Sequence, residues 1–314
     1  MRFWPRRWLR KSEEPTLQAD EDLLRRVRRL EFRTRTFVDS LFTGEYHSVF
    51  IGRGTEFSHV RGYQSGDDVR TIDWKVTARR GTPFVRRFVE ERDLLVTLVV
   101  DVSASGRFAP GERSVAEVAT EIVAALSFAA ARNSDRLSLV LASDRVERIV
   151  PAGSGRRHSV KLISEHLSHH EEGRGTDLVP ALDLVARARG GRALVFLVGD
   201  FILNEPLDAF ENALGRAARA HDIVAVRIAG PAEAEELPAL GWVEMTDPES
   251  GARTILNTGR RSVRRRYRDS VAGARDAVGE ALVRAGAEVV EVDTSADALE
   301  VLARFLTRRR GAPR

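Results

Sequence analysis

From residue 94 onward, short uninterrupted apolar runs alternate with longer segments in which apolar residues recur every three or four positions. The short runs are typical of strands buried on both faces, and the longer segments are typical of helices with one buried face. The expected strands are 94–100, 137–142, 146–150, 193–198, 223–228 and 288–292. The expected helices are one that follows Ser114, then 157–167, 179–188, 206–220, 259–285 and 296–306. This alternation predicts an α/β fold with a doubly wound, mostly parallel sheet.

Two local signals refine this pattern. Ser114 and Glu117 have the spacing of a capping box, which predicts that a helix begins just after Ser114. Residues 242–245 and 254–256 flank a turn-forming Asp-Pro-Glu-Ser-Gly segment and predict a hairpin.

The first third of the chain has a different pattern. Residues 20–41 combine near-helical spacing of apolar residues with acidic residues in the first turn. Beyond Gly44, short strands separated by glycine-rich and charged turns are expected at 46–51, 57–63 and 83–89. We therefore expect three parts: a flexible basic and aromatic tail over 1–19, an N-terminal helix with a small β-containing unit over 20–93, and the α/β domain over 94–310.

The composition is ordinary for a soluble globular protein, with 43% hydrophobic and 31% charged residues. No apolar stretch approaches the roughly 20 residues that cross a bilayer, and residues 1–10 lack the apolar segment of a secretory leader. Cysteine is absent, which excludes disulfides and thiolate chemistry. We therefore expect a cytoplasmic protein. Its one candidate membrane contact is the N-terminal tail, where Phe3, Trp4 and Trp8 lie among arginines.

Oxygen-bearing side chains occur where three of the predicted loops meet the sheet. The residues are Asp101, Ser103, Ser105, Thr176 and Asp200. The first three follow the strand 94–100, the last follows the strand 193–198, and the threonine precedes a helix, so all are expected at the carboxyl edge of the sheet. Carboxylate and hydroxyl oxygens suit a hard cation such as Mg²⁺ or Mn²⁺. Because hydroxyls are neutral, a cation held there stays electrophilic and accepts a carboxylate from another molecule.

Capping of turns and helices is the structural alternative for these residues, because Asp and Ser often have that role. Asp177 is better explained as a helix cap than as a ligand, and Asp144 as a residue of a hairpin turn. The convergence of three separate segments favours the metal site.

The pattern Asp101-x-Ser103-x-Ser105, followed by Thr176 and Asp200, resembles the metal-ion-dependent adhesion site of von Willebrand factor type A domains. Upstream segments resemble the bacterial family called domain of unknown function 58, and they are 44–50, 52–54, 66–74 and 84–88. Together the resemblance covers about residues 25–310. It implies a von Willebrand A-like domain, and a MoxR-type AAA+ ATPase as partner in the assembly or activation of other proteins.

Two positions depart from that family pattern. Gly106 stands where relatives often carry Met, which loosens the turn after Ser105. Gly199 stands where relatives often carry Ser, which implies the loss of a hydroxyl that supports Asp200. Neither change removes a ligand, so we expect a metal site of reduced affinity.

Other titratable residues invite competing interpretations. His166 and His169 have an i, i+3 spacing that could share zinc, but no third ligand accompanies them, and a solvated helix face explains them better. Asp67, Asp68 and Asp73 alternate with basic residues, which favours salt-bridged turns over an acid–base pair. Trp74, which follows them, is expected to pack this unit on the main domain.

The strongest basic patch surrounds Tyr267 and consists of Arg260, Arg261, Arg264, Arg265, Arg266 and Arg268. Phosphate contacts would suit it, and they would make the protein a nucleic-acid-associated adaptor. However, only three of the 50 basic residues are lysine, so arginine is the background cation of this chain, and a solvated helix face is favoured over nucleic-acid binding.

These observations predict a metal-dependent protein–protein interaction module rather than an enzyme. The protein partner contributes an Asp or Glu to the metal. The chain has neither a Gly-x-Ser-x-Gly elbow nor a Gly-x-x-x-x-Gly-Lys-Ser/Thr phosphate loop, so it is not expected to hydrolyse ATP itself. The enzymatic alternative is a metal-dependent hydrolase that uses the same cation to activate water, although no general base is obvious near Asp101.

Overall fold

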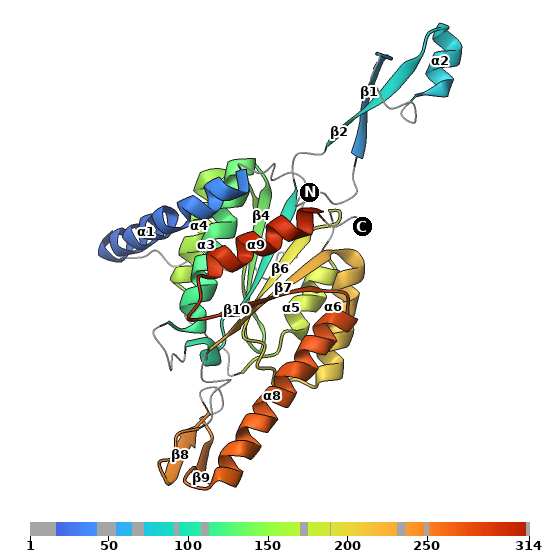
Figure 1. The fold of residues 1–314 in the computed structure, drawn as a ribbon. Coiled ribbons are helices and arrows are strands. Elements are labelled where there is room, and N and C mark those ends of the chain that lie inside the picture. The colour runs from blue at the N-terminus through green and yellow to red at the C-terminus, as the bar shows by residue number, and fades with distance from the viewer. Residues whose placement is uncertain are drawn as a thin grey trace.

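The computed structural model describes residues 17–42, 55–64, 72–90, 94–107, 113–169, 175–188, 190–230, 237–247 and 251–311. Its centre is a six-stranded sheet with the order β10-β7-β6-β3-β4-β5 (Figure 1). The strands are β3 (Leu95–Asp101), β4 (Arg136–Ala142), β5 (Val146–Gly153), β6 (Leu194–Gly199), β7 (Asp222–Ala229) and β10 (Glu288–Asp293). Every neighbouring pair is parallel except β4 and β5. The predicted doubly wound, mostly parallel sheet is confirmed.

The single antiparallel pair follows from the length of its connection. Only three residues join β4 to β5, and within them the Ser143 N–H donates to the Arg145 carbonyl at 2.9 Å. A parallel neighbour needs a crossover of about a dozen residues or more, so this short turn makes a hairpin. The turn also places Ser143 at the carboxyl end of β4, beside the end of β3.

Helices cover both faces of the sheet, as Figure 1 shows. One face is covered by α1 (Leu17–Phe42), α3 (Val115–Asn133), α4 (Gly155–Leu167) and α9 (Ala298–Gly311). The other is covered by α5 (Val179–Ala186), α6 (Leu207–Ala220) and α8 (Arg261–Arg284). Strand β3 contributes Leu98 to the first core and Val99 to the second, and both side chains have no exposed area. Burial on both faces explains why these strands are uninterrupted apolar runs.

Helix α3 begins where the capping box predicts. The Ser114 side chain accepts a hydrogen bond from the Glu117 N–H at 3.2 Å, and the Glu117 carboxylate accepts one from the Ser114 N–H at 2.8 Å. The helix lies between the sheet and α1, so it is buried along most of its length. This enclosure explains its Ala-rich sequence, because small side chains allow close packing on both sides.

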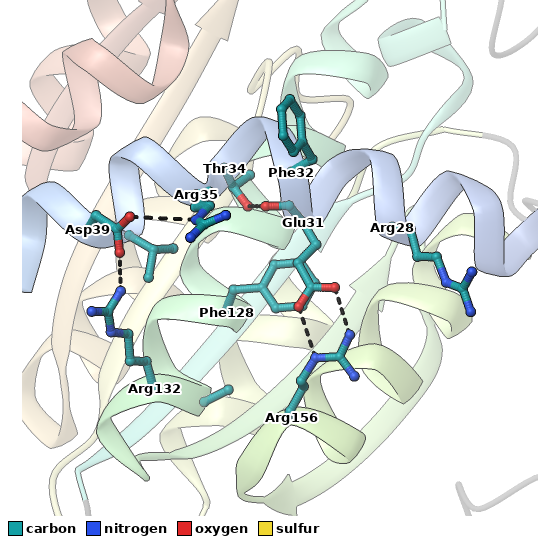
Figure 2. Close-up of a pocket in the computed structure, with 11 residues that line it drawn as sticks. Arg28, Glu31, Phe32, Thr34, Arg35, Asp39, Phe128, Arg132 and Arg156 are labelled. Carbon is teal, nitrogen blue, oxygen red and sulfur yellow. Dashed lines mark hydrogen bonds and ion pairs between the residues drawn. The ribbon is translucent and has the colours of Figure 1, made fainter.

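Ion pairs attach α1 to the α/β domain across an open groove of about 620 Å³ (Figure 2). Arg156 of α4 donates two hydrogen bonds, of 2.8 and 2.9 Å, to the Glu31 carboxylate, and these bonds lower the pKa of Glu31. Arg132 of α3 pairs with Asp39 of α1. These pairs engage much of the charge that lines the groove, so we assign it a structural role.

A two-stranded unit extends away from the sheet (Figure 1). It consists of β1 (Thr55–Gly62) and β2 (Phe84–Glu90), which are antiparallel, with α2 (Trp74–Arg80) between them. The strands predicted at 57–63 and 83–89 are confirmed within a residue or two, and the segment 46–51 lies outside the described residues.

Asp73 caps α2, because its carboxylate accepts the N–H groups of Lys75 and Val76 at 3.0 and 3.2 Å. This supports a structural role for Asp73, whereas Asp67 and Asp68 lie outside the described residues. The expectation that Trp74 packs on the main domain is wrong, because 68% of this residue is exposed. Its position at the start of a short helix in the projecting unit brings no core within reach.

A second projection follows β7. The predicted hairpin is confirmed as β8 (Trp242–Thr246) paired antiparallel with β9 (Arg253–Asn257), and α8 returns from it to the sheet (Figure 1). Among the described residues, no helix combines the length and apolar character needed to span a membrane.

Candidate functional site

Parallel pairing brings two of the predicted ligands to the same edge of the sheet. Strands β3 and β6 are neighbours, and Val100 lies opposite Val198. Asp101 and Asp200 come one and two residues after this pair, so both lie at the carboxyl ends of their strands. Asp101 ends β3 and Asp200 immediately follows β6. The expected juxtaposition of these two segments is therefore present in the fold.

The Asp-x-Ser-x-Ser segment folds back on itself. The Ser103 N–H donates to Asp101 Oδ1 at 2.9 Å, and the hydroxyl oxygens of Ser103 and Ser105 lie 3.1 Å apart. A short 3-10 helix, Ala104–Arg107, supports this turn, and Ser103 is buried. Adjacent oxygens around an octahedral Mg²⁺ with bonds of about 2.1 Å are about 3.0 Å apart. The two hydroxyls therefore have the spacing of neighbouring ligands, and in the absence of a metal the same spacing is a hydrogen bond.

Gly199 packs directly against Asp101. A methyl group built on Gly199 would lie 2.6 Å from Asp101 Cβ and 3.2 Å from its Oδ2. The hydroxyl expected to be missing at Gly199 is absent, and a side chain on this backbone would displace Asp101. The glycine allows close approach of β6 to Asp101, the predicted ligand on β3.

A backbone bend follows Asp200. Phe201 has a φ of 59°, which is rare for a residue with a Cβ, and its buried ring packs edge-on against Phe210 with centroids 6.3 Å apart. The Ile202 N–H donates to Asp200 Oδ1 at 3.0 Å. Packing of Phe201 therefore holds the bend that positions Asp200 at the end of β6.

Thr176 is fully buried in a loop that two other loops hold in place. Its N–H donates to Asn204 Oδ1 at 2.6 Å, and the Asn204 N–H donates to the Thr176 carbonyl at 3.0 Å. The Leu178 N–H donates to Glu205 Oε1 at 3.0 Å. On the other side, the Asp177 N–H donates to the Ser143 carbonyl at 2.9 Å. The loop with Thr176 thus bridges the segments that follow β4 and β6, on either side of Asp101.

Asn204, Glu205 and Ser143 are supporting residues that the sequence did not indicate. Burial raises the pKa of Glu205, whose Oε2 is buried and receives no hydrogen bond within the described residues. Asn204 and Glu205 precede a helix beside Pro206, so their sequence context suggests only a helix start. Their contacts with residues almost thirty positions away have no local signature.

The donor set consists of two carboxylates and three hydroxyls. Within the described ranges, no group of three or more His, Asp or Glu residues is arranged to hold a metal. The five residues therefore do not resemble a zinc or calcium site, in which several His or carboxylate side chains surround the ion. A set with few charges fits a small hard cation that keeps waters and exchanges one ligand.

Asp177 and Asp144 have the structural roles expected of them. Asp177 Oδ1 accepts the Val179 N–H at 2.9 Å at the start of α5, and Asp144 lies in the β4–β5 turn, where it pairs with Arg145 at 2.8 Å. Neither needs to be a ligand.

The expectation of a solvated helix face is wrong for His166 of α4 and for His169, which follows that helix, because each contacts a different protein group. His166 Nε2 makes a 3.0 Å hydrogen bond with Thr120 Oγ1, and its Nδ1 is buried. His169 pairs with the buried carboxylate of Glu147, which also accepts the Ser143 hydroxyl. The packing of α4 against α3 encloses His166, which spacing alone does not reveal.

Comparison with known proteins identifies the family. The family described as "Protein of unknown function DUF58" matches residues 59–277. A Mycobacterium tuberculosis protein designated "Uncharacterized protein Rv1480" is 31% identical over 296 residues, which are 93% of this chain and 92% of that protein. Among solved structures, BatB from Bacteroides thetaiotaomicron matches 70% of this chain and all of its own, with 15% identity and a TM-score of 0.44. The VWA domain of SpRpn10 matches 70% of this chain and 99% of its own, with 10% identity and a TM-score of 0.39. The family match and the Rv1480 relationship show that this chain belongs to the DUF58 family.

Proposed function

We propose that this protein is a metal-dependent protein-interaction module. Asp101, Ser103, Ser105, Thr176 and Asp200 hold Mg²⁺ or Mn²⁺ directly or through water. An Asp or Glu of a protein partner completes the coordination. The observation that carries the proposal is the 3.1 Å separation of the Ser103 and Ser105 hydroxyls beside Asp101, at a sheet edge where three loops meet.

The chemistry of the donor set explains why such a site binds a partner. Two carboxylates balance a divalent cation, and the hydroxyl ligands add no further negative charge. The site therefore has no excess negative charge to repel an incoming carboxylate, which can displace a water from the cation. Three features of the chain hold the ligands in place. The Ser103 N–H donates to Asp101 within the turn, Gly199 allows β6 to approach Asp101, and Asn204 holds the loop that carries Thr176 by hydrogen bonds.

The resemblance to the family suggests the setting of this interaction. We propose that the protein is an adaptor or co-chaperone that works with a MoxR-type AAA+ ATPase. Metal-dependent capture of an acidic segment would then couple the ATPase to a client protein or would attach the ATPase itself. This chain would supply recognition, and the partner would supply ATP hydrolysis.

The test compares affinity capture from native lysate with Mg²⁺ and with EDTA, using the wild-type chain and Asp101→Ala. A protein retained by the wild type only with Mg²⁺, and lost with Asp101→Ala, is the expected result. Asp293→Ala is a matched control, because Asp293 ends β10 at the same edge and accepts the Ser295 N–H at 2.7 Å, as Asp101 accepts that of Ser103. Equal capture by wild type and Asp101→Ala, or capture that EDTA does not change, would disprove the mechanism.

A further inference from the structure

Large apolar side chains are exposed at the sheet edge that carries the proposed metal site and on the hairpin that projects beyond it (Figure 1). Ile202 is exposed two residues after Asp200, and Leu240, Trp242 and Ile255 are exposed on the projection that follows β7. Trp242 is 72% exposed and Ile255 is 66% exposed. We call residues 240–247 and 251–268 the arm. Exposed apolar groups gathered in one region of a soluble domain mark an interaction surface.

The arm presents these side chains in a defined arrangement. The register pairs Trp242 with Asn257 and Glu244 with Ile255, so Trp242 and Ile255 lie on one face of the hairpin. Glu244 on the same face pairs with Arg253 at 3.3 Å. The opposite face is less exposed, because Val243, Met245 and Leu256 are each half-buried.

Thr258 ties the hairpin to α8. Its N–H donates to the Gly241 carbonyl at 2.7 Å, and its hydroxyl accepts the Leu240 N–H at 3.2 Å. Arg264 donates to the Thr258 carbonyl at 2.7 Å. These contacts fix the hairpin relative to the beginning of α8, so the hairpin and the first turn of the helix are held together.

An arginine stripe lies along the first two turns of α8. Arg261, Arg264, Arg265 and Arg268 have i, i+3, i+4 and i+7 spacing, which places them on one face of the helix. Arg261 and Arg265 are exposed, and neither makes an ion pair within the described part of the chain. The first turn contains no acidic residue, and the helix N-terminus repels positive charge, so the stripe opposes helix stability. Exposed arginines that do not stabilise the helix can contact a negatively charged partner.

The arm projects from the same edge of the sheet as the proposed metal ligands. Strand β7 is parallel to β6, which is parallel to β3, so Ala229 at the end of β7 lies at the carboxyl edge with Asp101 and Asp200. The arm is the next described structure after β7, and Figure 1 shows it extending beyond this edge. One molecule can therefore reach both.

We infer that the arm docks the protein partner whose carboxylate completes the metal site, and that the docked surface is acidic with an apolar cleft for Trp242. This inference rests on the proposed function. Binding through the arginine stripe requires negative charge on the surface of the partner. Tryptophan and arginine are the side chains that dominate binding energy at protein interfaces. A bilayer would require an apolar face without the Glu244–Arg253 pair. A nucleic acid could use Trp242 and the arginines but would leave the exposed aliphatic Leu240 and Ile255 without a partner.

The test uses the full chain and the protein recovered by Mg²⁺-dependent capture, after its purification. Trp242→Ala and Arg261→Glu/Arg265→Glu are each expected to weaken its affinity by about tenfold or more. The controls are Trp74→Ala, which removes another exposed tryptophan, and Arg304→Glu/Arg308→Glu, a reversal with the same i, i+4 spacing on α9. Both controls should bind as the wild type does. A photo-crosslinking amino acid at position 242 should attach to a peptide of the partner that is rich in Asp and Glu.

Each outcome separates the two proposals. If both arm variants bind the partner with wild-type affinity while Asp101→Ala does not bind it, the proposal that the arm docks the partner is wrong. The metal mechanism is then still supported. Loss of binding in the arm variants, with no effect of Asp101→Ala, overturns the metal mechanism and the shared interface. Attachment to a peptide without acidic residues overturns the stated chemistry. If the arm variants lose binding only to a short DNA duplex or to phosphatidylglycerol vesicles, the occupant is not a protein. If no Mg²⁺-dependent protein is recovered, both proposals fail.

Discussion

Gly199 on β6 and the side chain of Asp101 on β3 lie so close that a methyl group on Gly199 would be 2.6 Å from Asp101 Cβ. Relief of a contact at this distance requires the two strands to separate, because rotation of the carboxylate leaves Asp101 Cβ in place. The glycine therefore sets the position of the central residue of the proposed site, although it has no functional group of its own.

Gly199→Ala is expected to destabilise the fold by about 1–3 kcal/mol, because the added methyl overpacks two adjoining strands. It should also weaken Mg²⁺ binding, since Asp101 is displaced. Thermal or urea unfolding measures the first effect, and titration calorimetry measures the second. Gly230→Ala is the control, because Gly230 follows β7 at the same edge and has nothing within 4 Å of an added methyl. Equal losses in both variants would show that the contact with Asp101 is not the cause.

Mg²⁺ is expected to stabilise the folded protein without any partner present. A ligand that binds only the native state adds about 2.7 kcal/mol at a concentration 100 times its dissociation constant. Urea unfolding in increasing Mg²⁺ should show this gain in the wild-type chain and lack it in Asp101→Ala. Identical unfolding with Mg²⁺ and with EDTA would contradict the proposed site.

Asn204→Ala should weaken metal binding through Thr176. The substitution removes the acceptor of the 2.6 Å hydrogen bond from the Thr176 N–H, and such a loss costs about 1–3 kcal/mol when the donor is buried. The loop with Thr176 then loses one of its two contacts with Asn204. Comparison of Mg²⁺ affinity with that of Asn133→Ala, a change at the end of α3, isolates the effect of the clamp. Unchanged Mg²⁺ affinity in Asn204→Ala would exclude Thr176 as a ligand that this clamp positions.

His166 predicts a loss of stability in mild acid. Burial, together with the nearby charges of His169 and Arg26, lowers the pKa of His166 from 6.5 to about 4. His166 therefore binds a proton near pH 6.5 in the unfolded chain but only near pH 4 in the folded chain. Neutral His166 contributes its full stabilisation above pH 6.5, and the free energy of unfolding falls as the pH is lowered from 6.5 to 4. The largest loss is about 3 kcal/mol, from 1.36 kcal/mol per pKa unit.

His166→Gln keeps a hydrogen-bonding atom for Thr120 and removes the titration. Urea unfolding between pH 7 and pH 4 should give this variant a shallower decline in the free energy of unfolding than the wild type. Parallel declines in the two proteins would show that His166 is not responsible.

Several features are settled by neighbouring residues along the chain, and the sequence predicts them. The uninterrupted apolar run before Asp101 indicates a strand buried on both faces, and Ser114 with Glu117 indicates the start of α3. The alternation of such elements implies a parallel sheet, whose geometry brings the segments of Asp101 and Asp200 to one edge. The family could be identified from the Asp-x-Ser-x-Ser pattern together with the upstream segments between residues 44 and 88.

Contacts between distant segments decided the rest. The need for glycine at 199 depends on the distance between β6 and β3, and the clamp on Thr176 depends on a loop that comes 28 positions later. Exposure of Trp74 and Trp242 and enclosure of His166 depend on which elements pack above them. Hydrophobic pattern and capping are local properties of the chain, whereas burial and close approach are set by how the elements pack, so only the tertiary structure determines them.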